Sequence, residues 1–216
     1  ILNDEDMRSA VHDWDNSSEA RKSHIITRQA ELMMETIVSG DRKNRIEALK
    51  KIFNICGSAH NIDFIPPTIF KTMEVALKLG SDDTLVLVLA VTRELVDNSA
   101  KLQFFFDENS TLLNYLMYTT EHRIKSIRQL RENVSAVQTS EISYLENTLS
   151  GIIASLSLSV IGRGVISRTK NELFPTIITF SCFCPSIKTL TMLLGAVCST
   201  LQTEKKLCEA AASDTF

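Results

Sequence analysis

The chain has 216 residues, of which 44% are hydrophobic and 23% are charged, with 7 glycines and 4 prolines. This apolar content excludes a disordered tail, and the low glycine and proline content disfavours a β-sandwich, which needs many tight turns. A net charge of −3 disfavours a nucleic-acid-binding protein, and no apolar run of about 18 residues is present that could span a membrane. We therefore expect neither a nucleic-acid partner nor integral membrane association.

Helical patterns follow a polar lead-in. Residues 1–24 are acidic and predict an irregular or short helical segment. After them, apolar residues recur at three- and four-residue steps, which is typical of the buried face of a helix. Gly40, Gly57 and Gly80 predict where successive helices end, and Ser81–Asp83 predicts the N-terminal cap of the next one.

The run Leu85–Val91 is compatible with two structures. Seven consecutive apolar residues with three valines fit a buried strand of a parallel sheet. The apolar pattern continues through Leu95 and Val96, however, and this length favours a helix that is buried on most sides. We predict a helix here.

Residues 119–141 are polar and include several basic side chains. One interpretation is a basic patch that binds phosphate or a membrane surface. The other is a solvated insertion with one amphipathic turn built on Ile124, Ile127 and Leu130. We favour the insertion.

The cysteines indicate a reducing compartment. Their number is odd and no Cys-x-x-Cys pair occurs, so we expect reduced, mostly buried thiols in a cytosolic or nuclear protein. They are Cys56, Cys182, Cys184, Cys198 and Cys208. The four histidines are scattered singly, so neither a metal site nor another cofactor is expected.

A repeat is present in the helical pattern. Four apolar helical segments have equivalent positions at Asn54, Glu94, Ser155 and Thr200, which are 40, 61 and 45 residues apart. Steps of about 40 to 47 residues are typical of armadillo and HEAT units. The longer middle step contains the polar segment 119–141, which we interpret as an insertion, since repeat proteins accept insertions in their loops.

Short motifs give the repeat a family resemblance. Ile52–Cys56 resembles the third-helix signature of the armadillo family, and Leu95–Leu102 and Thr200–Leu207 resemble the turn that follows it. The resemblance covers residues 25–216 and implies an all-α, right-handed armadillo/HEAT-like solenoid of about four to five units. The only tryptophan, Trp14, lies outside every unit, so the tryptophan–asparagine array of nuclear import adaptors is absent.

Within the family, the order of motifs is most similar to the armadillo domain of adenomatous polyposis coli-related proteins. The residues behind this similarity are Glu74–Leu77, Asp83–Leu85 and the helix that begins Gly151–Ile153. The resemblance implies a non-enzymatic, protein-binding scaffold in Wnt/β-catenin signalling and cytoskeletal regulation. It also implies a cytoplasmic location, with the nucleus and the cell cortex as further sites. Because the chain begins at Ile1 without a signal peptide, we expect a fragment of a longer protein.

The polar faces of the stacked helices predict a peptide groove. Residues three and four apart share a helix face, and an asparagine there can donate to and accept from the backbone of an extended peptide. The candidate groove residues are Lys50, Asn54, Ser58, Glu94, Asn98, Gly151, Ser155 and Thr200. The alternative interpretation is that these are simply solvated positions of amphipathic helices.

No catalytic motif is recognisable. Gly-x-Ser-x-Gly, P-loop and dinucleotide-binding patterns are all missing from the sequence. Glu94 and Asp97 could form an acid–base pair, but carboxylates on such a helix face are more typical of solvent or peptide contacts. We expect no enzymatic activity. The alternative to a peptide-binding scaffold is a structural solenoid segment that packs within a larger protein or self-associates.

Overall fold

The structure is a computed structural model that describes residues 4–98, 111–129, 136–159, 162–164, 166 and 187–213. The described elements are all α-helices, and no strand occurs among them, so the predicted all-α class is confirmed. The helices are α1 (Asp4–Ser39), α2 (Arg42–Cys56), α3 (Ala59–Ile62), α4 (Ile69–Leu79), α5 (Asp82–Asn98), α7 (Leu112–Gln129), α8 (Ala136–Ser157) and α11 (Ile187–Ser213). None of these helices is long and apolar enough to cross a bilayer.

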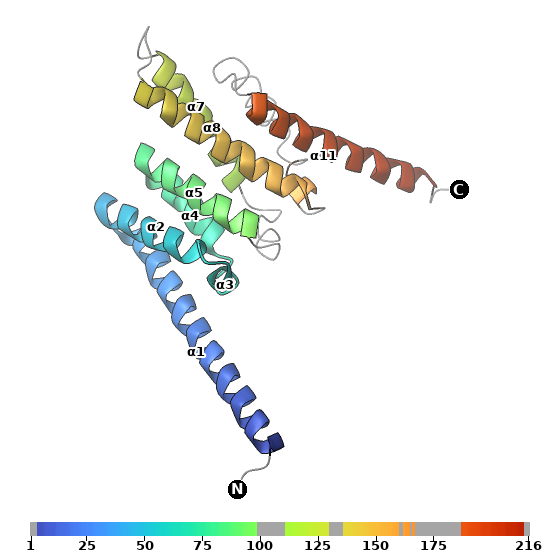
Figure 1. Ribbon diagram of the computed structural model, residues 1–216. Coiled ribbons are helices and arrows are strands. Elements are labelled where there is room, and N and C mark those ends of the chain that lie inside the picture. The colour runs from blue at the N-terminus through green and yellow to red at the C-terminus, as the bar shows by residue number, and fades with distance from the viewer. Residues whose placement is uncertain are drawn as a thin grey trace.

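The helices form two layers (Figure 1). In one layer α2, α5, α8 and α11 are neighbours in that order, and in the other α4 packs between α1 and α7. Shared apolar contacts hold the layers together, with Ile37, Leu49, Met73 and Leu89 among the fully buried side chains. Burying each such side chain contributes about 1.5–3 kcal/mol. Each helix therefore depends on its immediate neighbours for its buried face.

Glycines follow three of the helices, as the sequence predicts. Gly40, Gly57 and Gly80 come directly after the last residues of α1, α2 and α4. At Gly80 the reason is steric, because a Cβ there would lie 2.6 Å from the Ala76 carbonyl oxygen. The chain can turn this closely toward α5 only without a side chain at that position.

The apolar run Leu85–Val91 lies inside α5, so the helix prediction is confirmed and the strand alternative is wrong. The cap of α5 differs from the expected one. The Ser81 N–H donates to Thr84 Oγ1 at 3.3 Å, and the Ser81 carbonyl accepts from the N–H groups of Thr84 and Leu85. The Ser81 hydroxyl itself has no partner among the described residues. The side-chain bond of the cap is therefore made by Thr84.

Two segments that the sequence marks as polar lie in long helices where the structure describes them. The predicted lead-in is the first half of α1, which continues without a break to Ser39, since neither glycine nor proline interrupts residues 4–39. The predicted insertion 119–141 is divided between the end of α7 and the start of α8, with residues 130–135 and thus Leu130 outside the described part. Ile124 and Ile127 are buried in the core. Because polar residues separate these buried ones, residues 119–129 are polar in composition although they are helical.

Arg45, in the first turns of α2, connects the C-terminal ends of α1 and α4. Its guanidinium donates to the carbonyl oxygens of Ile37 at 3.0 Å, Gly40 at 3.0 Å and Leu79 at 3.2 Å. Only 9% of the residue is exposed. The last carbonyls of a helix have no partner within the helix and carry partial negative charge. The partial negative charge of two helix ends thus stabilises the buried cation, and the cation supplies hydrogen bonds to the carbonyl oxygens there.

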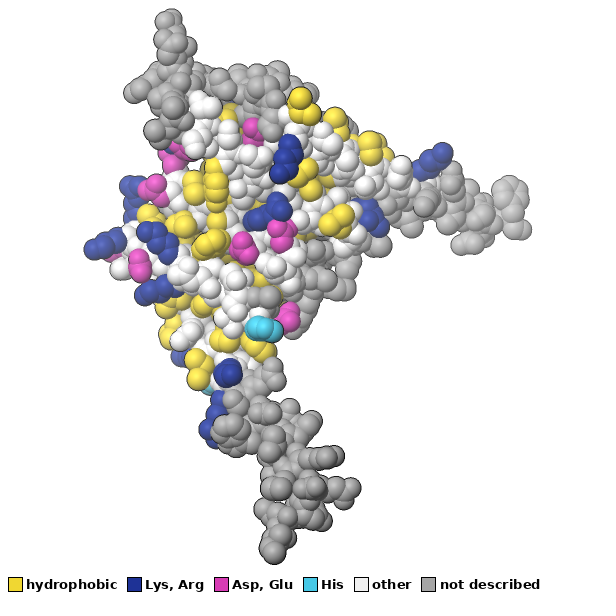
Figure 2. Space-filling model, viewed as in Figure 1, with side chains coloured by type: hydrophobic (Ala, Val, Ile, Leu, Met, Phe, Trp, Pro, Cys, Tyr) yellow, Lys and Arg dark blue, Asp and Glu magenta, His cyan; other side chains and the backbone are white. Residues whose placement is uncertain are grey.

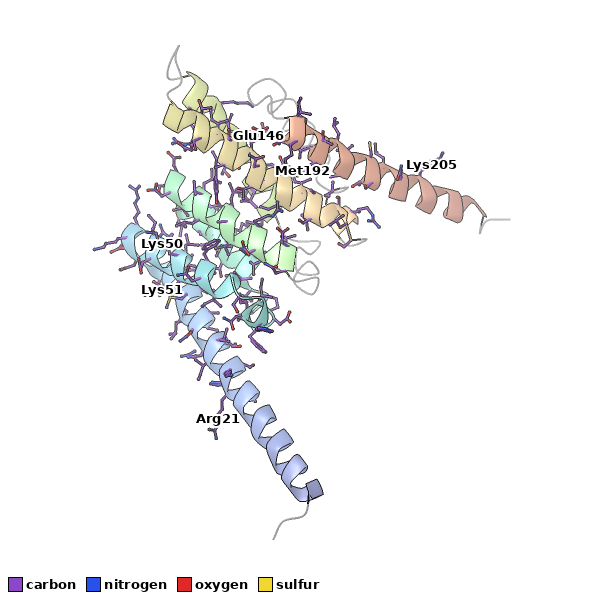
Figure 3. All side chains as sticks on the ribbon, in the orientation of Figure 1. Arg21, Lys50, Lys51, Glu146, Met192 and Lys205 are labelled. Atoms are coloured by element: carbon purple, nitrogen blue, oxygen red, sulfur yellow. The ribbon has the colours of Figure 1, made fainter. Side chains whose placement is uncertain are left out.

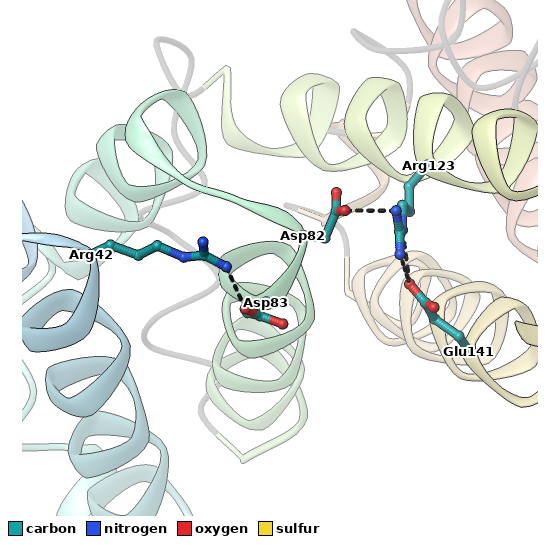
Figure 4. Close-up of polar contacts among 5 residues, drawn as sticks. All are labelled: Arg42, Asp82, Asp83, Arg123 and Glu141. Atoms are coloured by element: carbon teal, nitrogen blue, oxygen red, sulfur yellow. Dashed lines mark hydrogen bonds and ion pairs between the residues drawn. The ribbon is translucent and has the colours of Figure 1, made fainter. Parts of the chain in front are cut away.

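Ion pairs link neighbouring helices (Figure 4). Arg42 of α2 pairs with Asp83 of α5 at 2.8 Å, and both side chains are mostly exposed. Arg123 of α7 bridges Asp82, at 2.6 Å, and Glu141 of α8, at 2.8 Å. The exposed pair of Arg42 and Asp83 contributes less than about 1 kcal/mol. Arg123 is less exposed and connects α7 to both α5 and α8.

We predict that Arg45→Ala lowers the free energy of unfolding by about 3 kcal/mol, because it leaves buried carbonyls of α1 and α4 without donors. Urea denaturation followed by circular dichroism measures the change. The matched control Lys43→Ala removes an exposed cation from the same helix and should change the free energy by less than about 0.5 kcal/mol. Equal effects of the two substitutions would contradict the role of Arg45.

Candidate functional site

The candidate site is the exposed surface over α2, α5 and α8. Figure 2 shows basic and acidic side chains in the middle of the viewed face, with exposed hydrophobic side chains around them. The order of α2, α5 and α8 in their layer places the predicted residues of these three helices on consecutive elements (Figure 1).

On α2, Lys50 and Asn54 are exposed and lie one turn apart, while Leu49 and Ile52 of the same helix are buried. Figure 3 shows Lys50 beside its exposed neighbour Lys51. The Asn54 amide has a donor and an acceptor that a partner can reach. This arrangement follows from the helical period, since side chains at i and i+4 share a face.

Ser58 follows the end of α2 and is partly exposed. It occupies the N-cap position of the short helix α3, but its side chain makes no capping hydrogen bond there. The Ser58 hydroxyl therefore has no role in the cap.

On α5, Glu94 and Asn98 are bonded to each other. The Asn98 side-chain amide donates to a Glu94 carboxylate oxygen at 3.0 Å. Glu94 is partly buried and Asn98 is exposed. The pair leaves one amide N–H and the amide oxygen of Asn98 for other partners.

Ser155 connects α8 to α5. Its hydroxyl donates a hydrogen bond to the Asp97 carboxylate, and Arg93 also pairs with Asp97. The side chains of Arg93 and Asp97 are 35% and 31% exposed, so this cluster lies at the rim of the helix contact rather than in the core. It combines a cation, an anion and a hydroxyl within reach of the surface.

Gly151 is buried and contributes space instead of a side-chain contact. A Cβ at this position would lie 1.1 Å from a guanidinium nitrogen of Arg93. The missing side chain thus lets the Arg93 guanidinium lie directly on the backbone of α8. Its role in the site is to position Arg93.

Thr200 is not on the exposed surface. The residue is 5% exposed, and its hydroxyl donates to the Ala196 carbonyl of the same helix at 2.9 Å. The exposed face of α11 is instead formed by Ile187, Leu194 and Leu201. The structure therefore brings Gly151 and Ser155 of α8 against Arg93 and Asp97 of α5. Thr200 is buried on α11 and does not belong to the exposed surface.

Cys56 lies beneath the surface, at the end of α2. The pKa of its thiol is raised to about 12. Burial is the main cause, and the nearby negative charge of Glu94 is a second one. This electrostatic contact places Glu94 close to α2. The other described cysteine, Cys198 of α11, is exposed, whereas Cys182, Cys184 and Cys208 lie outside the residues whose side chains are described.

Sequence reasoning missed Arg93 and its pairing with Asp97. The separation of four residues places both on one face of α5, and Gly151 inside a helix is a signal for a close approach by a neighbouring side chain. Neither signal shows which helix provides the neighbouring side chain. For the described residues, no group of three histidine, cysteine or acidic side chains could hold a metal ion.

Comparisons of the chain with protein-family models, with curated proteins and with solved structures give no match. The geometry of the site is therefore the basis for a functional proposal, together with the sequence motifs.

We predict that Cys56 does not react with iodoacetamide at neutral pH, because the thiolate is the reactive form and a pKa of about 12 leaves almost none of it. Exposed Cys198 serves as the internal control and should be alkylated. Peptide mass spectrometry distinguishes the two sites, and unfolding in urea should make Cys56 reactive. Equal labelling of both cysteines in the folded protein would contradict the buried position of Cys56.

Proposed function

We propose that this chain is a non-enzymatic, armadillo-type solenoid scaffold that binds extended segments of partner proteins along α2, α5 and α8. The observation that carries the proposal is the layer of consecutive helices in which Lys50, Asn54, Asn98 and Ser155 are accessible to a ligand. The cytoplasmic location and the signalling role implied by the armadillo resemblance are part of the same proposal.

The chemistry of this surface suits a peptide backbone. An extended peptide has unpaired N–H and C=O groups along its length, which amide and hydroxyl side chains can satisfy. Asn54 and Asn98 provide both donors and acceptors, and the Ser155 hydroxyl oxygen can accept a bond while its hydrogen is donated to Asp97. Lys50, Arg93 and Asp97 add charges of both signs that can select side chains of the peptide.

Preorganisation supports the same conclusion. Bonds within the surface, from Asn98 to Glu94 and from Arg93 and Ser155 to Asp97, already order several of these side chains. A ligand that binds to ordered side chains loses less conformational entropy on association. Most of the affinity would then come from backbone hydrogen bonds, and the specificity from the charged groups.

We predict that a phage-displayed random library selected on the intact chain yields a class of peptides that contact Asn54, Asn98 and Ser155. These peptides should bind the variant Asn54→Ala/Asn98→Ala/Ser155→Ala at least tenfold more weakly, because the variant lacks the side chains that bond to the peptide backbone. Fluorescence anisotropy with labelled peptides measures the affinity. N-methylation of alternate backbone amides of the same peptides should abolish binding.

The matched control is Gln29→Ala/Ser143→Ala/Gln202→Ala, which also removes two amides and one hydroxyl from exposed helical positions. It should leave the affinity unchanged. If every selected peptide binds the triple variant of α2, α5 and α8 as tightly as the original chain, the peptide-binding function is wrong.

A second candidate function is self-association through α11. Ile187, Leu194 and Leu201 are 81%, 53% and 52% exposed and are seven residues apart, with exposed Thr191 and Cys198 between them. Spacings of four and three residues along one face are typical of a coiled-coil seam. This face supports the interpretation of the chain as a structural segment that pairs with a second copy.

We predict that, if α11 pairs in this way, light scattering shows a molar mass that increases with concentration and returns to the monomer value in Leu194→Gln/Leu201→Gln. Both side chains are exposed, so the substitution should leave the fold intact. A monomer at all concentrations would exclude self-association and would leave the peptide-binding proposal unaffected.

A further inference from the structure

A groove of about 620 Å³ runs between α1 and α4, away from the surface of α2, α5 and α8. It is open along one side. Its lining residues are Glu31, Met34, Glu35, Val38, Ser39 and Thr72. The volume lies within the range of about 300–1,000 Å³ that ligand sites occupy.

The α1 wall of the groove is fixed on both sides of its lining residues. Before the groove, the Thr27 hydroxyl donates to the Phe64 carbonyl at 3.0 Å, which attaches α1 to the segment that leads into α4. After it, Arg45 donates to the carbonyls of Ile37 and Leu79, at the ends of α1 and α4. The separation of the two helices is thus set without a ligand, and binding would require little reorganisation.

The lining combines apolar surface with negative charge. Met34 is only 8% exposed and forms part of the floor, while Val38 is 46% exposed and presents a branched apolar side chain. Glu31 and Glu35 lie one turn apart on the same wall. Glu31 pairs with Arg28 at 3.2 Å, but both side chains are largely exposed, so this ion pair is weak and exchangeable.

Thr72 on the opposite wall adds no charge, and its hydroxyl donates to the Thr68 carbonyl of its own helix at 3.2 Å. The charge of the described lining residues is therefore negative. A ligand that matches it has cationic groups on either side of an apolar group.

We propose that this groove binds a basic peptide segment of a partner protein, with an apolar side chain against Met34 and Val38 and lysine or arginine side chains beside Glu31 and Glu35. The open side favours a peptide over an enclosed small molecule, because one face of the ligand remains in solvent. Complementary charge accelerates association and selects against acidic segments. The site is independent of the surface proposed for extended peptides, since the two share no residue.

The test uses a phage-displayed random peptide library selected on the intact chain, with removal of phage that bind Glu31→Lys/Glu35→Lys. The expected peptides are rich in lysine and arginine around one leucine, phenylalanine or methionine. By fluorescence anisotropy, Glu35→Lys should weaken their binding by about tenfold, and added salt should weaken it further.

Two matched controls separate the groove from general effects of charge and hydrophobicity. Glu47→Lys makes the same charge change at an exposed glutamate of α2 and should leave the affinity within about twofold of its original value. Val38→Ser should weaken binding, whereas Leu32→Ser, which removes an exposed apolar side chain of α1 outside the groove lining, should not.

The outcomes distinguish this site from the surface of α2, α5 and α8. Peptides of the groove class should bind the Asn54→Ala/Asn98→Ala/Ser155→Ala variant normally. Failure of the selection to yield peptides that discriminate against Glu31→Lys/Glu35→Lys would overturn the proposal, as would selected peptides that are acidic or that tolerate both Glu35→Lys and Val38→Ser.

Discussion

The buried guanidinium of Arg45 is the interaction on which the first part of the fold depends. Arg45 lies near the start of α2 and donates hydrogen bonds to carbonyl groups at the ends of α1 and α4. Three helices therefore meet at one side chain. A buried cation is costly unless its donors are satisfied, and here the partial charges of two helix ends satisfy them. The angle between α1 and α4, and with it the groove between them, follows from this junction.

Outside that junction, the helices pack through buried apolar faces, and polar side chains lie at the exposed edges, or rims, of these contacts. The inner helices α5 and α8 are covered by neighbours on either side. The long helices α1 and α11 continue beyond the others, where Arg21 and Lys205 are exposed (Figure 3). The rims hold the ion pairs and hydrogen bonds that order the candidate surfaces. Stability and recognition thus use different parts of the same helices.

The sequence predicts much of this organisation and fails where the partner of a side chain decides its role. Helix ends at Gly40 and Gly80 and the helical state of Leu85–Val91 follow from local rules, because turns and apolar periodicity are encoded within a few residues. Thr200 occupies an equivalent position in the repeat, yet it is buried against neighbours that the local pattern does not specify. The segment 119–141 has a polar composition, yet its described residues, 119–129 and 136–141, lie in α7 and α8.

The contact between Arg93 and Gly151 has a consequence for related sequences. The guanidinium occupies the volume that a Cβ at residue 151 would need, so a side chain there would displace the flexible end of Arg93. A chain with alanine or serine at 151 can keep arginine at 93 only with the guanidinium in a different position. Glycine at 151 thus goes with the present contact of the guanidinium with α8, next to its partner Asp97.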